Sequence, residues 1–107
     1  MHDLRQLDFA TFASAQLAPT DLAMLQEHGF ASLVNHRPDG EEAGQPDSES
    51  IRQAAESAGL RYVHLPVSGM PDAAAVQGTA EALAALRPGE KVLMFCRSGM
   101  RSTTAWA

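Results

Sequence analysis

The segment Lys91–Phe95 reads Lys-Val-Leu-Met-Phe, so four consecutive apolar residues follow its lysine. A strand with one solvated face alternates apolar and polar side chains, whereas a strand covered on both faces is apolar along its whole length. This run therefore predicts a central strand of a mainly parallel sheet, with helices packed on both of its faces.

Helix and strand signals alternate along the rest of the chain. Three helices are expected, the first from Pro19-Thr20-Asp21 to Gly29, the second from Asp47 or Ser48 to Gly59, and the third between Pro71-Asp72 and Pro88-Gly89. The other expected strands are Leu4–Leu7 and Phe12–Gln16, both weak, with Ala31–Asn35 and Arg61–Val67, while Arg37–Pro46 is expected to be a loop. This alternation predicts an α/β fold with a parallel core.

The composition is that of one ordinary globular domain spanning residues 1–107, with 45% hydrophobic and 20% charged residues. A net charge of −5 argues against a nucleic-acid or anionic-membrane partner. A single cysteine excludes an internal disulfide and two-cysteine zinc or redox motifs. No signal peptide or membrane span is visible, so a cytoplasmic location is expected, and no cofactor is implied.

The basic residues near the end of the chain predict a small anionic substrate. Lys91, Arg97 and Arg101 all lie between residues 91 and 107, a stretch without any acidic residue. A local positive site in an acidic chain favours a small anion over a large polyanionic partner.

Cys96 directly follows the predicted central strand, at the sheet edge where parallel α/β sheets bind ligands. A helix expected to begin near Arg101 would direct its N-terminal N–H groups and partial positive charge toward the sulfur. Such surroundings favour the thiolate over the thiol. A lone cysteine after a buried strand is usually an inert core residue, but Arg97 and Arg101 have no packing role that explains them beside such a residue.

The residues after Cys96 form a candidate anion-binding loop. Gly99 permits a tight backbone turn, and Arg101 can place a planar guanidinium on a bound anion. Ser98 and Ser102 can donate hydroxyl hydrogen bonds to a thiolate. The candidate catalytic residues are thus Cys96 and Arg101, and the candidate substrate-binding residues are Arg97, Ser98, Gly99, Met100 and Ser102.

Two family resemblances follow from these residues. Phe95–Ser102 resembles the active-site loop of rhodanese-type sulfurtransferases. Leu4–Leu7, Val34–Glu41 and Tyr62–Val67 resemble the DUF442 family, a phosphatase-like domain that occurs alone or fused to beta-lactamase-like hydrolases. This second resemblance covers essentially the whole chain.

The resemblance implies a protein-tyrosine-phosphatase-like three-layer fold with a mainly parallel central sheet and an anion-binding loop at a strand C-terminus. It further implies Cys96 as nucleophile, Arg101 as anion clamp, and a beta-lactamase-like hydrolase or persulfide dioxygenase as partner. Because domains of this family continue beyond the helix that follows the loop, the chain is expected to be truncated at its C-terminus.

Sulfur transfer through a Cys96 persulfide is the function that the sequence favours, with a cysteine-dependent phosphatase as the alternative. Phosphatases of this fold carry a histidine before the cysteine and five residues between cysteine and arginine, whereas Phe95 precedes Cys96 and four residues separate it from Arg101. A shorter loop is expected to suit a single sulfur better than a tetrahedral phosphate. A non-catalytic module that senses an anion or persulfide is a third possibility.

Several polar residues are expected to have no catalytic role. A phosphatase also needs a general acid, and Asp72, behind Pro71, fits a helix start better than that role. His64 is expected to be a satisfied strand residue, while His36 could line the mouth of the pocket. Asp39, Glu41 and Glu42 are expected to form a solvated loop without a metal.

Overall fold

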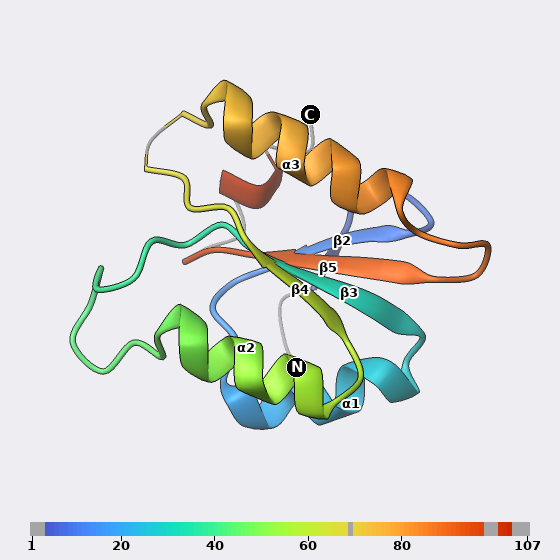
Figure 1. Cartoon of the computed structure of the whole chain (residues 1–107), viewed down its shortest axis with the longest axis horizontal. Helices are drawn as coiled ribbons and strands as arrows, with labels where there is room; N and C mark the ends of the chain where they lie inside the picture. The colour runs from blue at the N-terminus through green and yellow to red at the C-terminus, as the bar shows by residue number, and fades with distance from the viewer. Residues whose placement is uncertain (1–3, 69, 98–100, 104–107) are drawn as a thin grey trace.

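The computed structural model describes residues 4–68, 70–97 and 101–103, and it has the α/β fold that the sequence predicts. Its elements are β1 (Arg5–Gln6), β2 (Thr11–Ser14), the 3₁₀ turn η1 (Pro19–Asp21), α1 (Leu22–Glu27), β3 (Phe30–Asn35), α2 (Ser48–Ser57), β4 (Arg61–His64), α3 (Ala73–Ala84) and β5 (Lys91–Phe95). Residues 101–103 form a further helical turn. Helices α1 and α2 cover one face of the sheet and α3 covers the other (Figure 1).

The five strands form one sheet in the order β1-β2-β5-β3-β4. β1 pairs antiparallel with β2, and every other pair is parallel. The predicted central strand is confirmed, since β5 lies between β2 and β3 and covers the predicted residues Lys91–Phe95.

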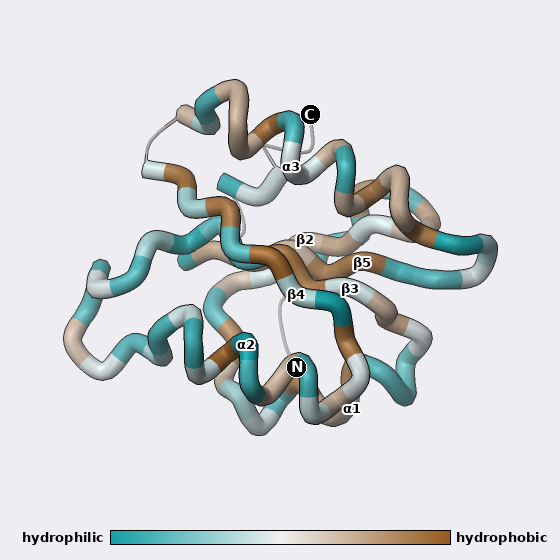
Figure 2. Tube along the Cα trace, in the orientation of Figure 1, coloured by the Kyte–Doolittle hydropathy of each residue, from teal (hydrophilic) through white to brown (hydrophobic). Residues whose placement is uncertain are grey.

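Side chains of β5 alternate between two separate cores. Leu93 and Phe95 belong to the larger core, under α1 and α2, whereas Val92 and Met94 pack on the α3 side. Hydrophobic colouring accordingly runs along the sheet in Figure 2, with hydrophilic colouring along much of the loop between β3 and α2. This double coverage is the physical reason that β5 is apolar throughout.

Helix boundaries follow the predicted caps. The Asp47 carboxylate accepts the Ser50 N–H at 2.8 Å at the start of α2, and Asp72 accepts the Ala75 N–H at 2.8 Å at the start of α3. Such N-caps satisfy backbone donors that have no partner within the helix.

The predicted strand Arg61–Val67 is shorter than expected, because β4 ends at His64. Pro66 has no N–H to donate to a neighbouring strand. The backbone nevertheless stays close to β3: Leu65 N–H donates to Asn35 O, and Val67 N–H donates to His36 O, both at 2.8 Å. The segment after β4 therefore runs on to the edge of the sheet where Cys96 lies.

Because β5 is buried on both faces, truncating one of its side chains should destabilise the fold. Leu93 is fully buried, and Leu93→Ala should lower the free energy of unfolding by about 3 kcal/mol, because it removes buried methyl groups and leaves a cavity. Urea unfolding at neutral pH measures this loss. Val76 on α3 is 45% exposed, so Val76→Ala should change stability by less than about 0.5 kcal/mol. Equal losses in both variants would contradict the central position of β5.

Candidate active site

Three parallel strands end in the same row at one edge of the sheet. Ser14 pairs with Phe95 in the register of β2 and β5, and Asn35 pairs with Phe95 in the register of β3 and β5. The ladder then continues by one step, with Cys96 N–H donating to Ser14 O at 3.3 Å and His36 N–H donating to Phe95 O at 2.8 Å. The chain leaves β3, β4 and β5 at this edge (Figure 1).

Cys96 and Arg101 come together at this edge. Cys96, the single cysteine of the chain, is fully buried, and Arg101 lies in the helical turn 101–103. The pKa of the Arg101 guanidinium is raised above its ordinary value, chiefly by hydrogen bonds with the Glu41 carboxylate and additionally by the sulfur of Cys96. Ser98, Gly99 and Met100, predicted to line the loop between them, lie outside the described residues.

Arg101 is held from two sides. Its two terminal nitrogens donate to the two oxygens of Glu41, each at 2.7 Å, in the bidentate arrangement that guanidinium and carboxylate groups prefer. Nη1 also donates to the Val67 carbonyl oxygen at 2.8 Å. The side chain of Arg101 is therefore fixed by a loop after β3 and by the segment after β4.

Glu41 lies in an exposed loop, as expected, but it also pairs with two arginines, which the sequence did not predict. Its side chain is 26% exposed, and in addition to Arg101 it accepts the Nε–H of Arg37 at 2.9 Å. Hydrogen bonds from Arg101, and to a lesser degree from Arg37, lower the pKa of Glu41 from 4.5 to about 2. Glu41 is therefore ionised at neutral pH and positions arginines; it cannot act as a general acid.

Its two acidic neighbours are also engaged. Asp39 accepts the Ser48 N–H at 2.8 Å, which ties the loop to the start of α2. Glu42 lies 2.7 Å from Arg97 Nε and 3.2 Å from Arg37 Nη2. The sequence alone does not show which residues pair with these carboxylates. Glu41 and Arg101, for example, are 60 residues apart in the chain.

His36 does not line the pocket mouth, contrary to expectation. It is fully buried, with Nδ1 2.8 Å from Ser102 Oγ and Nε2 2.9 Å from Thr79 Oγ1. Burial, with a smaller contribution from the nearby His64, lowers the pKa of His36 from 6.5 to about 4. His36 is thus neutral at physiological pH.

The hydroxyl groups around His36 fix the positions of its protons. Thr79 Oγ1 donates to the Ala75 carbonyl at 2.7 Å, so its single proton is used and it must accept from His36 Nε2–H. Nδ1 of His36 is then the acceptor for the Ser102 hydroxyl. Ser102 was expected to donate to the thiolate, but this arrangement commits its proton to His36.

Three further polar side chains have defined surroundings. The side chain of Arg97 is 66% exposed and points away from the core, toward Glu42. Asp72 caps α3, and His64 Nε2–H donates to the Arg37 carbonyl oxygen at 2.8 Å. Among the described residues no cluster of three or more acidic, histidine or cysteine side chains could hold a metal.

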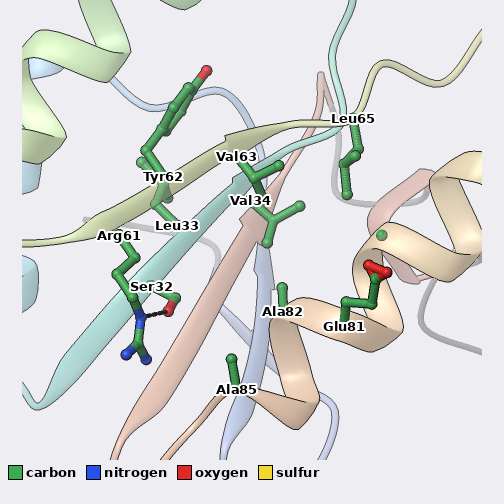
Figure 3. Close-up of a pocket in the computed structure, with 11 residues that line it drawn as sticks. Ser32, Leu33, Val34, Arg61, Tyr62, Val63, Leu65, Glu81, Ala82 and Ala85 are labelled. Atoms are coloured by element: carbon green, nitrogen blue, oxygen red, sulfur yellow. Dashed lines mark hydrogen bonds between the residues drawn. The ribbon is translucent and has the colours of Figure 1, made fainter.

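Among the hollows in the described part of the chain, two of similar size bear on the site. The first, of about 380 Å³, lies between α3 and the edge strand β4 and is lined by side chains such as Leu65, Val63 and Ala82 (Figure 3). Neither Cys96 nor Arg101 lines this first hollow. The second, of about 370 Å³, is lined by residues that include Arg37, Glu42 and Arg97. Arg97 is the residue that directly follows Cys96.

Residues 3–107 match the family model described as the phosphatase-like domain of beta-lactamase hydrolase-like protein. The chain belongs to this family. A beta-lactamase hydrolase-like protein of Xylella fastidiosa is 39% identical over 80 residues, which is 74% of this chain and 18% of the relative. The chain thus spans less than a fifth of the length of the curated relatives that it matches.

Solved structures share the fold. A candidate phosphatase from Neisseria meningitidis is 30% identical with a TM-score of 0.81, covering 94% of this chain and 71% of that one. TpbA of Pseudomonas aeruginosa, solved in complex with phosphotyrosine, is 21% identical with a TM-score of 0.64, covering 94% of this chain and 57% of that one. The predicted phosphatase-like fold is therefore confirmed, and these likenesses favour the phosphatase alternative over sulfur transfer.

No helix in the described part of the chain is both long and apolar enough to cross a membrane.

The low pKa of His36 makes the fold sensitive to mild acid. Because the folded protein keeps His36 neutral down to about pH 4 while the unfolded chain protonates it near pH 6.5, its contribution is complete above pH 6.5 and is lost as the pH falls toward 4. The full loss corresponds to about 3 kcal/mol. Urea unfolding between pH 7 and pH 4 measures it.

His36→Gln should lower stability at pH 7 but flatten this dependence between pH 6.5 and 4.5. His28 is exposed on the far side of the fold, so His28→Gln should keep the dependence of the natural chain. An equally steep dependence in His36→Gln would assign the acid sensitivity to other groups.

Proposed function

We propose that this chain is a cysteine-dependent phosphatase that hydrolyses phosphate monoesters, aryl phosphates in particular, with Cys96 as nucleophile and Arg101 as anion clamp. The observation that carries the proposal is the placement of Arg101 beside Cys96 with one edge of its guanidinium already committed to Glu41 and Val67.

The geometry of Arg101 supports an oxyanion as ligand. A guanidinium has five N–H donors, two on each terminal nitrogen and one on Nε. The bonds to Glu41 and Val67 use both donors of Nη1 and one of Nη2. The Nε–H and the second Nη2–H lie along the other edge, where they can bind two oxygens of one phosphate. A single persulfide sulfur offers only one acceptor to that pair.

The first chemical step forms a bond between Cys96 sulfur and phosphorus. The thiolate attacks the phosphate monoester in line with the leaving oxygen, the P–O bond breaks, and the released aryl oxide takes a proton from water. Arg101 neutralises charge on the equatorial oxygens as they pass through the transition state. Glu41, ionised at neutral pH, holds Arg101 in place and exchanges no proton.

The second step restores the enzyme. Water attacks the phosphorus of the phosphocysteine, the S–P bond breaks, and inorganic phosphate leaves with Cys96 again a thiolate. A covalent intermediate of this kind divides one hydrolysis into two easier displacements.

The predicted sulfur transfer has less support. The sequence favours it because Phe95 stands where a phosphatase carries a histidine, because the loop between Cys96 and Arg101 is short, and because Asp72 fits a helix start. Most of that loop lies outside the described residues. The family and the solved relatives are of the phosphatase type. Sulfur transfer is therefore the competing reaction that the experiments below distinguish from phosphate hydrolysis.

Two variants test the clamp. Arg101→Lys keeps the charge but cannot reproduce the bidentate geometry, so the kcat for para-nitrophenyl phosphate should fall about 100-fold or more. Cys96→Ser should abolish turnover, and intact mass spectrometry of the natural protein quenched in acid should detect a phosphoryl adduct on Cys96. Arg61→Lys on β4, where Arg61 pairs with Glu90, is the matched control and should retain activity.

Thiosulfate or glutathione persulfide is the competing substrate in the same preparation. Formation of a Cys96 persulfide with sulfur turnover, and no phosphate release above the Cys96→Ser background, would replace the phosphatase proposal by sulfur transfer.

Asp72 provides a further prediction, because its carboxylate caps α3. Asp72→Asn keeps an acceptor at the cap, so turnover of para-nitrophenyl phosphate and of phosphotyrosine should each change less than about threefold. Asp72→Ala removes the cap and should cost about 1 kcal/mol of stability in thermal or urea unfolding. A selective loss of phosphotyrosine turnover in Asp72→Asn would instead identify a general acid, because only the poorer leaving group needs a proton.

A further inference from the structure

We infer that the hollow lined by Arg37, Arg97 and Gln16 is a second oxyanion-binding subsite, which takes a carboxylate or phosphate group of the substrate in exchange for the carboxylate of Glu42. This inference rests on the proposed function, since it names the class of phosphate monoester that the site would select: one that carries a second anionic group.

The position of the subsite follows from the register of the sheet. Gln16, Arg37 and Arg97 each lie two residues after the end of a parallel strand, namely β2, β3 and β5. Because Ser14, Asn35 and Phe95 are in register, these three residues are brought to one edge. All three line the hollow of about 370 Å³. Arg97 follows Cys96 directly, so a substrate whose phosphate is bound at Cys96 can extend a second group toward this hollow.

Arg37 is built into the subsite as a buried cation. Its side chain is 3% exposed, its Nε–H donates to Glu41 and its Nη1 donates to Gln16 Oε1 at 2.9 Å. Nη2 is buried and makes no hydrogen bond among the described residues, although Glu42 Oε1 lies at an ion-pair distance of 3.2 Å. A buried guanidinium donor without a hydrogen bond is costly, and an anion with suitable geometry would satisfy it.

Glu42 has the properties of a displaceable stand-in for that anion. One oxygen, Oε1, is shared between Arg97 Nε and Arg37 Nη2. Its side chain is 46% exposed, and the Arg97 side chain is 66% exposed, so their ion pair is screened by solvent and contributes little. The backbone at Glu42 is held by hydrogen bonds with Gln45, so rotation of the exposed Glu42 side chain about its own bonds is what would move the carboxylate aside.

The charges at this edge favour the exchange. The three guanidinium groups of Arg37, Arg97 and Arg101 face two carboxylates, and Glu41 is committed to Arg101 and Arg37. Moving Glu42 into solvent leaves three guanidinium groups and the carboxylate of Glu41, a net charge of +2 for the anions of one substrate. Arg101 would bind the reacting phosphate, and Arg97 with Arg37 would bind the second group. Bidentate contacts of this kind give geometric selectivity as well as affinity.

The test uses aryl phosphates that differ only in a para arm: a carboxylate, carboxymethyl or carboxyethyl group, each compared with its primary amide. Affinity is measured by calorimetry on Cys96→Ser, which cannot turn the probes over, and kcat/KM is measured on the natural protein. At least one carboxylate arm should bind about tenfold more tightly than its amide. Phenylene bisphosphates form the second series, and a larger preference there would identify the second group as phosphate.

Two further variants, each combined with Cys96→Ser, should shift this preference in opposite directions. Glu42→Gln removes the competing carboxylate and should strengthen binding of the carboxylate probe about five- to tenfold, with less than a twofold change for the amide. Arg97→Gln should reduce the preference about tenfold. Glu49 and Arg52 form an exposed ion pair on α2, so Glu49→Gln and Arg52→Gln are controls with the same changes in net charge.

The results separate this inference from the proposed function. A carboxylate preference that both variants alter as stated supports the subsite, even if the natural protein releases no phosphate from any probe, in which case only the phosphatase proposal fails. Phosphate release with equal affinity for carboxylate and amide arms overturns the subsite and leaves the phosphatase proposal in place. Equal effects from the α2 controls would also overturn it, because overall charge would then explain the preference.

Discussion

The pairing of β5 with β2 on one side and β3 on the other is the constraint from which the site follows. Ser14, Asn35 and Phe95 form one row across the three strands, so the chain leaves each strand at the same edge. Backbone bonds to Ser14 and from His36 then extend the row past the last strand residues. A one-residue slip would turn the side chains of a strand to the opposite face. The buried faces of β5 therefore fix the register, and the register gathers the functional residues.

Glu41 connects the two chemical parts of this edge. It binds Arg101 bidentately and Arg37 through Nε, so a single ionised carboxylate orients both the guanidinium beside Cys96 and the guanidinium under the neighbouring hollow. Two arginines in such proximity would repel each other without a carboxylate between them. The loop from Arg37 to Pro46, which looks like a plain solvated connection in the sequence, is thus a structural part of the site.

The sequence predicts what depends on neighbouring residues and misses what depends on distant contacts. Lys91–Phe95 was predicted with its observed bounds, because double burial leaves a continuous apolar run. The caps Asp47 and Asp72 were likewise predictable, because capping is a local interaction. The role of Glu41 was not, since its partner Arg101 is 60 residues away and the sequence does not record which charges meet.

His36 and the choice of reaction show the same limit. Beside Arg37 and a polar loop, His36 looks exposed, but the ladder bond to Phe95 carries it one step further into the sheet, where Thr79 and Ser102 enclose it. The sequence favours sulfur transfer because Phe95 stands where the phosphatases carry a histidine, because four residues separate Cys96 from Arg101, and because Asp72 fits a helix start better than a general acid. These local features do not show how the Arg101 guanidinium is oriented. Its orientation depends on hydrogen bonds with Glu41 and Val67, which are distant in the sequence.

The proton arrangement around His36 bears on how the thiolate of Cys96 is stabilised. At neutral pH His36 carries its proton on Nε2, toward Thr79, and accepts the Ser102 proton on Nδ1. Ser102 then has no second proton to donate to sulfur. Among the described residues, Arg101 is a cation that can balance the negative charge of a Cys96 thiolate, and the sulfur in turn contributes to the raised pKa of Arg101. Glu41 already offsets one positive charge at this edge. For stabilising the thiolate, the position of Arg101 relative to Cys96 therefore matters more than the total charge. That position is set by the hydrogen bonds of Arg101 with Glu41 and Val67.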